Sequence, residues 1–71
     1  YKKLIQELIS IRESKKVTQV ELATSLNKPQ SYVAKVENLD RRLDILELTD
    51  WLTALDISII QFIEKTFTEG A

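Results

Sequence analysis

The stretch TQVELATSLNKPQSYVAKVE, residues 18–37, decides the fold, because it reads as two short helices joined by a tight turn. Thr18 is followed three residues later by Glu21, the spacing of a capping box, in which each side chain satisfies a backbone N–H left open at a helix start. The first helix is therefore predicted to begin at about Gln19. Its apolar residues recur at helical spacing on one face: Leu22, Ala23 and Leu26.

The turn between the two helices is set by Asn27, Lys28 and Pro29. Pro29 disfavours helical geometry in Lys28 and so ends the first helix, whereas Asn27 tolerates the left-handed conformation that such a turn needs. Pro29 is also a favoured first-turn residue, and we expect it to open the second helix. In that helix Val33 and Val36 are expected to point inward. A separate polar stripe is expected to face outward: Gln30, Ser31, Ala34 and Lys35.

These features together resemble the helix-turn-helix of the phage-repressor and Cro-like (Xre) family. The matching residues are spread over the whole motif: Gln19, Leu22, Ala23, Leu26, Val33, Val36 and Glu37. The segments LISIRESKKVTQ before the motif and ENLDRRLDILELTDWLTALDIS after it resemble the flanking helices of the family, so the resemblance covers roughly residues 4–63. It implies an all-α fold, a compact bundle of five short helices like a lambda-repressor-like DNA-binding domain.

Two positions after the turn depart from the family pattern. The family usually has glycine where this chain has Leu39, and a leucine there would be strained at positive φ. Asn38 is expected to take the left-handed conformation instead. Ala34 stands where the family often has serine, so one polar contact to DNA is expected to be missing.

The rest of the chain predicts three further helices. One is expected over about residues 2–14. Asp44 with Glu47 repeats the capping box and starts a fourth helix, and Ser58 with Gln61 starts a fifth. The residues expected to be buried in the first and fourth helices recur at three- and four-residue steps: Leu4, Ile5, Leu8, Ile11, Leu48, Trp51, Leu52 and Leu55.

Length and composition point to one small domain, residues 1–71, with the motif at about residues 19–38 and the N-terminus truncated, since the chain starts at Tyr1 rather than methionine. Such a short chain buries only about 60% of its unfolded surface, so a partner subunit would help. No apolar run approaches the roughly 20 residues of a membrane span. The absence of cysteine excludes disulfides and thiolate metal sites. We expect a cytoplasmic protein without a membrane segment or a cofactor.

The charge is unevenly distributed along the chain. The net charge is −1, and a nucleic-acid-binding domain is usually basic. However, residues 1–42 carry nine basic and five acidic side chains, whereas residues 43–71 carry one basic and six acidic side chains. The basic half contains the motif. A protein that touches DNA with one face needs positive charge only on that face, so this distribution fits DNA binding. The alternative is that the basic side chains are only a solvated surface.

Base readers are expected at the start of the second motif helix, the part that enters the major groove in this docking geometry. The resemblance places them at Gln30, Ser31 and Lys35. Glutamine can form two hydrogen bonds with the N6/N7 edge of adenine, a contact worth about 1–3 kcal/mol of discrimination. Tyr32 is expected to pack at the rim of the core rather than to stack on a base.

Contacts to the DNA backbone are expected on either side of these readers. Gln19 matches the family residue that holds a phosphate from the start of the first motif helix. Asn38, Arg41 and Arg42 follow the second helix and are expected to hold the sugar-phosphate backbone. The alternative for the two arginines is pairing with nearby carboxylates of the chain: Glu37, Asp44 or Glu47.

The fifth helix is expected to carry a homodimer contact. Its apolar residues span about 160° of a helical wheel, wider than the roughly 100° that one core-facing helix needs: Ile59, Ile60, Phe62, Ile63 and Phe67. By the family pattern Ile59, Phe62 and Ile63 face inward, which leaves Ile60 and Phe67 open. The predicted dimer interface consists of Ile60, Ile63 and Phe67. The alternative is that terminal residues cover this edge.

We therefore predict a sequence-specific protein that binds double-stranded DNA and regulates transcription, a repressor acting as a homodimer on a palindromic operator. Enzymatic activity is not expected, since the chain lacks histidine, cysteine, a glycine-rich phosphate loop and an evident nucleophile–base pair. The first alternative is a protein-interaction module of the same fold, an antitoxin or adaptor, with DNA binding secondary. The second is a structural helical domain of a longer enzyme.

Overall fold

The computed structural model describes residues 1–67, which form an all-α bundle with short connections. The helices in this part of the chain are α1 (Lys2–Ser14), α2 (Gln19–Leu26), α3 (Gln30–Glu37), α4 (Ile45–Ala54) and α5 (Ile59–Phe67). The predicted bundle of five short helices is confirmed, as are the predicted bounds of the first helix and the predicted start of the second. None of these helices is long and apolar enough to cross a membrane.

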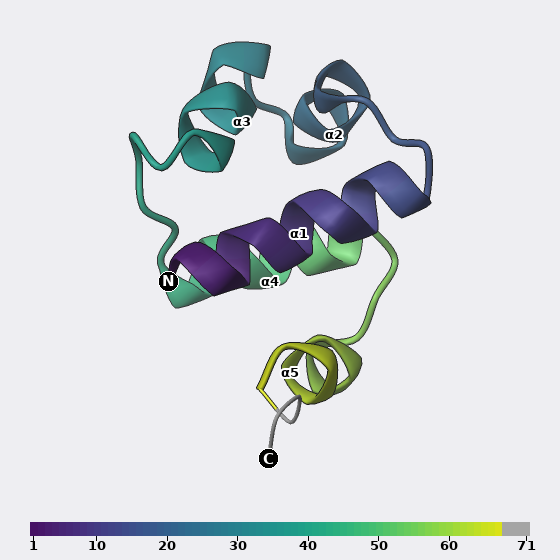
Figure 1. Cartoon of the computed structure of the whole chain (residues 1–71). Coiled ribbons are helices and arrows are strands. Elements are labelled where there is room, and N and C mark those ends of the chain that lie inside the picture. The colour runs from purple at the N-terminus through teal and green to yellow at the C-terminus, as the bar shows by residue number, and fades with distance from the viewer. Residues whose placement is uncertain (68–71) are drawn as a thin grey trace.

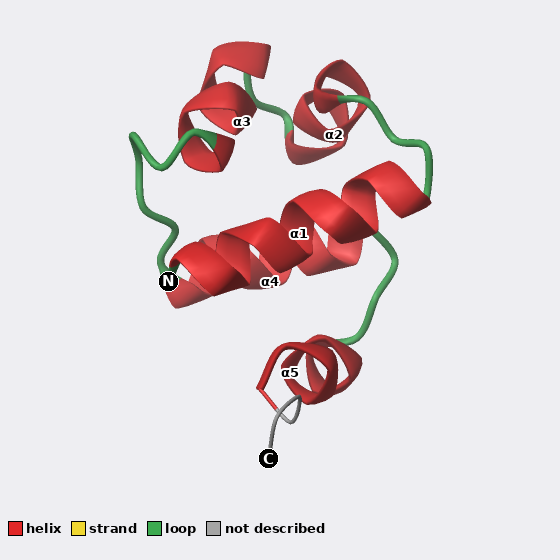
Figure 2. Cartoon of the chain, in the orientation of Figure 1, coloured by secondary structure: helices red, strands yellow, loops and turns green. Residues whose placement is uncertain are grey.

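The helices are arranged with α2 and α3 on one side of α1 and α4, and α5 on the other (Figure 1). Figure 2 shows α2 and α3 as two short helices joined by a tight loop. The main helix contacts are those of α2 with α3 and α4, of α1 with α3 and α5, and of α4 with α5. As a result, α3 has one face open to solvent, and α5 lies far from it.

One apolar core holds the bundle together. It consists of Ile5, Leu8, Ile11, Leu22, Ala23, Val33, Val36, Leu48, Trp51, Leu52, Leu55 and Phe62. Every residue predicted to be buried in the first four helices is in this core except Leu4 and Leu26, which are partly buried and pack against it. Full burial of a leucine- or phenylalanine-sized side chain contributes about 1.5–3 kcal/mol, so this core is the main source of stability.

Predicted capping boxes begin three of the helices. At the start of α2, Thr18 Oγ1 accepts the Glu21 N–H at 3.0 Å, and the Thr18 N–H donates to Glu21 Oε1 at 2.9 Å. The same reciprocal bonds join Asp44 with Glu47 and Ser58 with Gln61. Pro29 differs from the prediction. Its ψ of 155° is extended, so it is the N-cap of α3 rather than its first helical residue.

Helices α1 to α4 are each followed, one or two residues after their last residue, by a residue with positive φ: Lys16, Asn27, Leu39 and Asp56. The left-handed conformation predicted for Asn27 is confirmed. The prediction for Asn38 is wrong, because Asn38 has a φ of −84° and Leu39 has a φ of 67°. The Leu39 N–H donates to the Val36 carbonyl and the Asp40 N–H to the Lys35 carbonyl. This pattern of a Schellman motif requires the left-handed residue one position after the helix cap, whatever its side chain.

Replacing Leu39 with glycine should therefore stabilise the fold. A left-handed leucine costs about 1–2 kcal/mol, of which the greater freedom of glycine in the unfolded chain offsets about 0.4–1 kcal/mol. Urea unfolding followed by Trp51 fluorescence should give a higher midpoint for Leu39→Gly. The matched control is Asn38→Gly, at negative φ, which should lower the midpoint. A midpoint lowered equally in both variants would contradict the strain at Leu39.

The position of α5 corrects another prediction. Phe62 is completely buried, as predicted, but Ile59 and Ile63 are 37% and 46% exposed rather than turned inward. The helix rests on the core through a narrow edge formed by Phe62 and Thr66, which are four residues apart and both buried. Ile60 and Phe67 are exposed as predicted. The outer side of α5 is thus a wider apolar stripe than the sequence predicted.

Candidate nucleic-acid interface

The outward face of α3 presents polar side chains to solvent. Gln30, Ser31 and Lys35 are exposed, and so is Asn38 directly after the helix. Ser31, Lys35 and Asn38 follow one another at steps of four and three residues, which puts them on one side of the helix, and Gln30 directly precedes Ser31. Val33 and Val36, on the opposite side, are completely buried and hold α3 against the core. The predicted base readers therefore lie together on an accessible surface. Ala34 lies between them and is partly buried.

A largely buried ion pair fixes the last residue of α3 to α1. Arg12 of α1 donates to both carboxylate oxygens of Glu37, from Nε at 2.7 Å and from Nη2 at 3.0 Å. The side chains are only 11% and 5% exposed. Arg12 Nη1 also donates to the Val17 carbonyl at 2.8 Å. Charge-assisted bidentate pairs of this kind are strong and directional. This pair sets the position of α3 relative to α1.

Sequence reasoning did not predict this pair. The partners suggested for Glu37 were Arg41 and Arg42, which are only a few residues away in sequence. The position of Arg12 could have indicated the pair. Arg12 follows the buried Ile11 and lies one helical turn after the buried Leu8, and a charged side chain at such a position needs a partner. The spatial proximity of residues 12 and 37 follows from the packing of α1 against α3.

Glu37 is linked through Gln19 to Gln30, one of the predicted readers. Gln19 Nε2 donates to Glu37 Oε1 at 2.9 Å, and Gln30 Nε2 lies 3.5 Å from Gln19 Oε1. A carboxylate can only accept hydrogen bonds, so the Gln19 amide must turn its NH₂ group toward Glu37 and its oxygen toward Gln30. Gln30 then uses one N–H for Gln19, which leaves its second N–H and its oxygen for another partner. A donor and an acceptor on one amide are what the N6/N7 edge of adenine requires.

Arg41 lies in the loop between α3 and α4 and is held by two side chains. Its Nη2 is 2.9 Å from Glu47 Oε2, and its guanidinium lies 4.8 Å from the centroid of the Tyr32 ring. The hydrogen bond from Arg41 and that from the Asp44 backbone lower the pKa of the Glu47 carboxyl. The pair is therefore fully charged at neutral pH, and its contribution is lost only as the pH falls through the acidic range. Of the alternatives weighed for Arg41, pairing with Glu47 is observed.

Arg42 has a different neighbour. Its guanidinium lies 4.4 Å from the centroid of the Tyr1 ring. The Tyr1 hydroxyl accepts the Leu43 N–H at 3.0 Å and donates to the Arg41 carbonyl at 3.4 Å. The start of the described chain is thus tied to the α3–α4 loop, beside which it lies in Figure 1. Arg42 stays exposed.

The positive charge of this surface is only partly neutralised. Arg12 and Arg41 are paired with carboxylates. Within residues 1–67, no carboxylate oxygen lies within 4.0 Å of the cationic group of Lys28, Lys35 or Arg42. These three side chains are exposed and come from the α2–α3 turn, from α3 and from the loop after α3. The surface around the predicted readers is suited to an anionic ligand.

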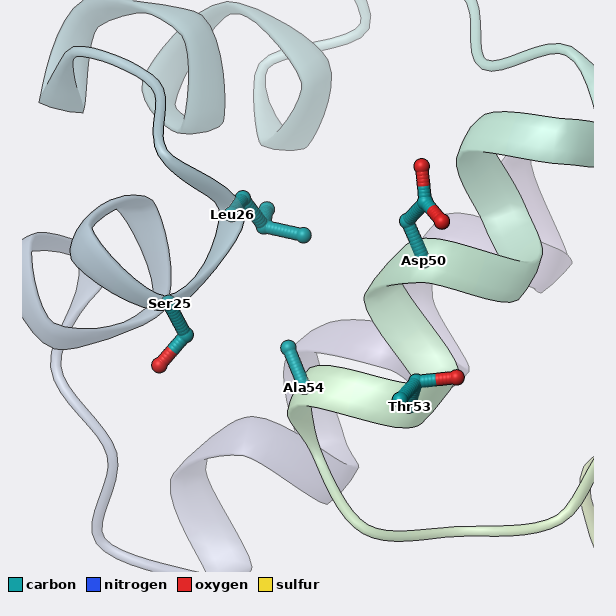
Figure 3. Close-up of a pocket in the computed structure, with 5 residues that line it drawn as sticks. All are labelled: Ser25, Leu26, Asp50, Thr53 and Ala54. Carbon is teal, nitrogen blue, oxygen red and sulfur yellow. The ribbon is translucent and has the colours of Figure 1, made fainter.

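A hollow of about 370 Å³ lies between the end of α2 and α4, away from this face. It is lined by Ser25, Leu26, Asp50, Thr53 and Ala54 (Figure 3). The Ser25 hydroxyl points away from the Asp50 carboxylate, and the apolar side chains of Leu26 and Ala54 lie between them. These lining residues do not form a nucleophile–base pair.

Comparison with known proteins identifies one family. A family model described as helix-turn-helix matches residues 8–62, well over half of the chain, and this match includes α2, α3 and α4 completely. No curated protein and no solved structure matches the chain.

Proposed function

The chain belongs to the Xre and lambda-repressor-like helix-turn-helix family, whose domains bind DNA and regulate transcription. From this membership we propose that it is a repressor that binds a palindromic operator as a homodimer and reads its sequence with α3. A cytoplasmic location is part of the proposal. The observation that carries the proposal is the position of Gln30. Its side chain is exposed on α3 and lies within 3.5 Å of Gln19, which in turn donates a hydrogen bond to Glu37.

In the proposed complex the exposed face of α3 enters the major groove. Gln30 reads an adenine, and Ser31 and Lys35 contact neighbouring base edges. The side chain of Gln30 is suited to this role because it is exposed and its amide lies 3.5 Å from Gln19 Oε1, a contact that favours one orientation. A preoriented side chain loses less conformational entropy on binding.

Contacts to the sugar-phosphate backbone position α3 in the groove without reading sequence. We assign them to residues that flank α3: Gln19, Asn38, Arg41 and Arg42. Gln19 retains one amide N–H beyond the one bound to Glu37, and Asn38 and Arg42 are exposed. Arg41 is shared with Glu47, so a phosphate would compete for a guanidinium that is already ordered.

The proposed dimer uses the outer side of α5. Ile60, Ile63 and Phe67 are 67%, 46% and 59% exposed and recur at three- and four-residue steps, so they form one apolar stripe. A stripe of this kind can be self-complementary about a two-fold axis. Helices α1 and α4 lie between α3 and α5, so a contact through the outer side of α5 does not cover the recognition helix (Figure 1). Two half-sites one DNA turn apart require a separation of about 34–36 Å between them.

A second candidate function is favoured by one observation. Ile45 and Leu46 at the start of α4 are 63% and 73% exposed, and they form an apolar surface away from the outer side of α5. Such a surface is typical of protein–protein contacts. An antitoxin or adaptor with secondary DNA binding would use it. In that case Ile45→Ser with Leu46→Ser would abolish the biological activity but leave DNA affinity unchanged.

The proposal is tested by Gln30→Ala. Loss of one bidentate base contact should weaken binding to the preferred duplex by roughly 5- to 150-fold, the equivalent of about 1–3 kcal/mol. Binding to a random duplex should change little, because the phosphate contacts remain. Fluorescence anisotropy with both duplexes measures the two effects. Gln6→Ala removes an exposed glutamine from α1 and is the matched control. Equal losses on both duplexes would show that Gln30 does not read a base.

A further inference from the structure

One aromatic ring contacts cations from both ends of α3. The Nζ of Lys28, in the turn before α3, lies 5.7 Å from the centroid of the Tyr32 ring. The guanidinium of Arg41, in the loop after α3, lies 4.8 Å from the same centroid. Both distances are within the range of cation–π attraction. Tyr32 therefore contacts one positive side chain from each of the two loops that flank α3.

The Tyr32 ring is itself fixed by the core. It packs edge-on against Trp51, with the centroids 6.1 Å apart and the planes at 60°. Trp51 is 1% exposed, and its Nε1 donates to the Tyr32 hydroxyl at 3.1 Å. The hydroxyl in turn lies 3.4 Å from Glu47 Oε2. Because the ring is anchored to a buried residue of α4, the cations that rest on it have a defined position relative to α3.

The charge balance of this cluster favours an anion. Two cations that share one ring repel each other, and the ring compensates only part of that repulsion. Glu47 neutralises Arg41, at 2.9 Å, but no carboxylate oxygen of the described residues lies within 4.0 Å of Lys28. The cluster therefore keeps unneutralised positive charge in an exposed place. It also lies beside the helix that is proposed to enter the major groove, where a DNA strand passes close to the protein.

We infer that Lys28, Tyr32 and Arg41 form a clamp for a DNA backbone phosphate. Lys28 and Arg41 bind the phosphate, and Tyr32 is a positioning residue that holds both cations and does not itself touch the DNA. This inference rests on the proposed DNA contact of Arg41 and adds Lys28 and Tyr32 to it. Long side chains lose much rotamer freedom when they are ordered, so a ring that orders two of them in advance increases affinity for DNA of any sequence.

The experiment first distinguishes the effect of the Tyr32 ring on DNA affinity from that of its hydroxyl. It then tests whether the ring acts through Lys28 and Arg41. Tyr32→Phe keeps the ring, and Tyr32→Leu removes it. Each is combined with Arg41→Ala and with Lys28→Ala. The affinity for random and preferred duplexes is measured at several salt concentrations. Far-UV circular dichroism during urea unfolding establishes conditions in which every variant is folded.

Tyr32→Leu should weaken binding to both duplexes alike, by roughly 5- to 150-fold, because Lys28 and Arg41 must then be ordered on binding at a cost of about 0.5–1.5 kcal/mol each. Tyr32→Phe keeps the ring but loses the hydrogen bonds of the hydroxyl to Trp51 and Glu47, so it should weaken binding clearly less than Tyr32→Leu. Arg41→Ala and Lys28→Ala should each reduce the slope of log affinity against log salt by roughly one unit when the ring is present. In the Tyr32→Leu background both substitutions should have much smaller effects, because the cations are already displaced.

Three results would overturn the clamp. The first is an equal loss in Tyr32→Phe and Tyr32→Leu, which would assign the effect to the hydroxyl and to packing on Trp51. The second is a full, additive effect of Arg41→Ala in the Tyr32→Leu background. The third is a slope of log affinity against log salt that is the same in Arg41→Ala and in Lys28→Ala as in the unchanged protein. All three leave the preference for one duplex over random DNA intact. Loss of that preference in the unchanged protein would instead refute the proposed function.

Discussion

Glu37→Ala is expected to reduce the free energy of unfolding by about 3–5 kcal/mol. The change leaves the Arg12 guanidinium, 11% exposed, without its counter-charge, and it removes the acceptor of Gln19. An unpaired buried charge is much more costly than the loss of the attraction alone. Since a small domain has only about 5–15 kcal/mol in total, this variant should be largely unfolded at moderate temperature.

The measurement is urea unfolding followed by Trp51 fluorescence. Glu13→Ala is the matched control, because Glu13 is an exposed glutamate of α1 next to Arg12 in sequence. It should shift the midpoint little. Arg12→Met combined with Glu37→Leu should recover much of the lost stability, since an apolar replacement leaves no buried charge. If Glu37→Ala shifts the midpoint as little as Glu13→Ala does, the ion pair does not hold α3 against α1.

The second large effect is expected for Ile60→Glu combined with Phe67→Glu. Both side chains are more than half exposed, so the monomer should fold with glutamates in their place. In a two-fold dimer, however, four negative charges would face each other without solvent. The variant should sediment as a monomer. It should lose about 10²- to 10⁴-fold in operator affinity, because the second half-site is no longer engaged at high effective concentration.

The matched control for this variant is Ile45→Glu combined with Leu46→Glu, which adds the same charge to the other exposed apolar surface. It should remain dimeric. Sedimentation velocity distinguishes the outcomes. If the α5 variant stays dimeric while the α4 variant becomes monomeric, the dimer contact belongs to α4 and the assignment to Ile60, Ile63 and Phe67 is wrong.

The local features of the fold were predictable because their causes lie within a few residues. The capping boxes at Thr18 and Asp44 depend only on the side chain three positions later. The turn at Asn27 depends on Pro29. Leu39 shows the limit of this reasoning. Its positive φ is imposed by the hydrogen bonds that close α3, which outweigh the preference of the side chain.

Helical spacing alone predicted the outward face of the second motif helix, and the family resemblance placed the readers on it. The contacts that support the readers depend on tertiary packing. The exposure of Gln30, Ser31 and Lys35 follows from the burial of Val33 and Val36 on the opposite side of α3.

The contacts of Glu37 with Arg12, 25 residues apart, and of Arg41 with Tyr32 join different elements, and no spacing rule along one helix predicts them. The exposure of Ile59 and Ile63 was missed for the same reason. It depends on how narrow an edge α5 presents to α1 and α4.

The central claim, that this domain reads DNA sequence through α3 as a two-fold dimer, is tested most directly by selecting bound duplexes from a random pool with the purified chain. The proposal predicts an enriched palindrome whose half-sites are about 10 base pairs apart, centre to centre. Selection with Gln30→Ala should lose the preference for adenine at one position in each half-site. A pool that shows no enriched sequence after repeated rounds, although the protein retains DNA in low salt, would contradict it.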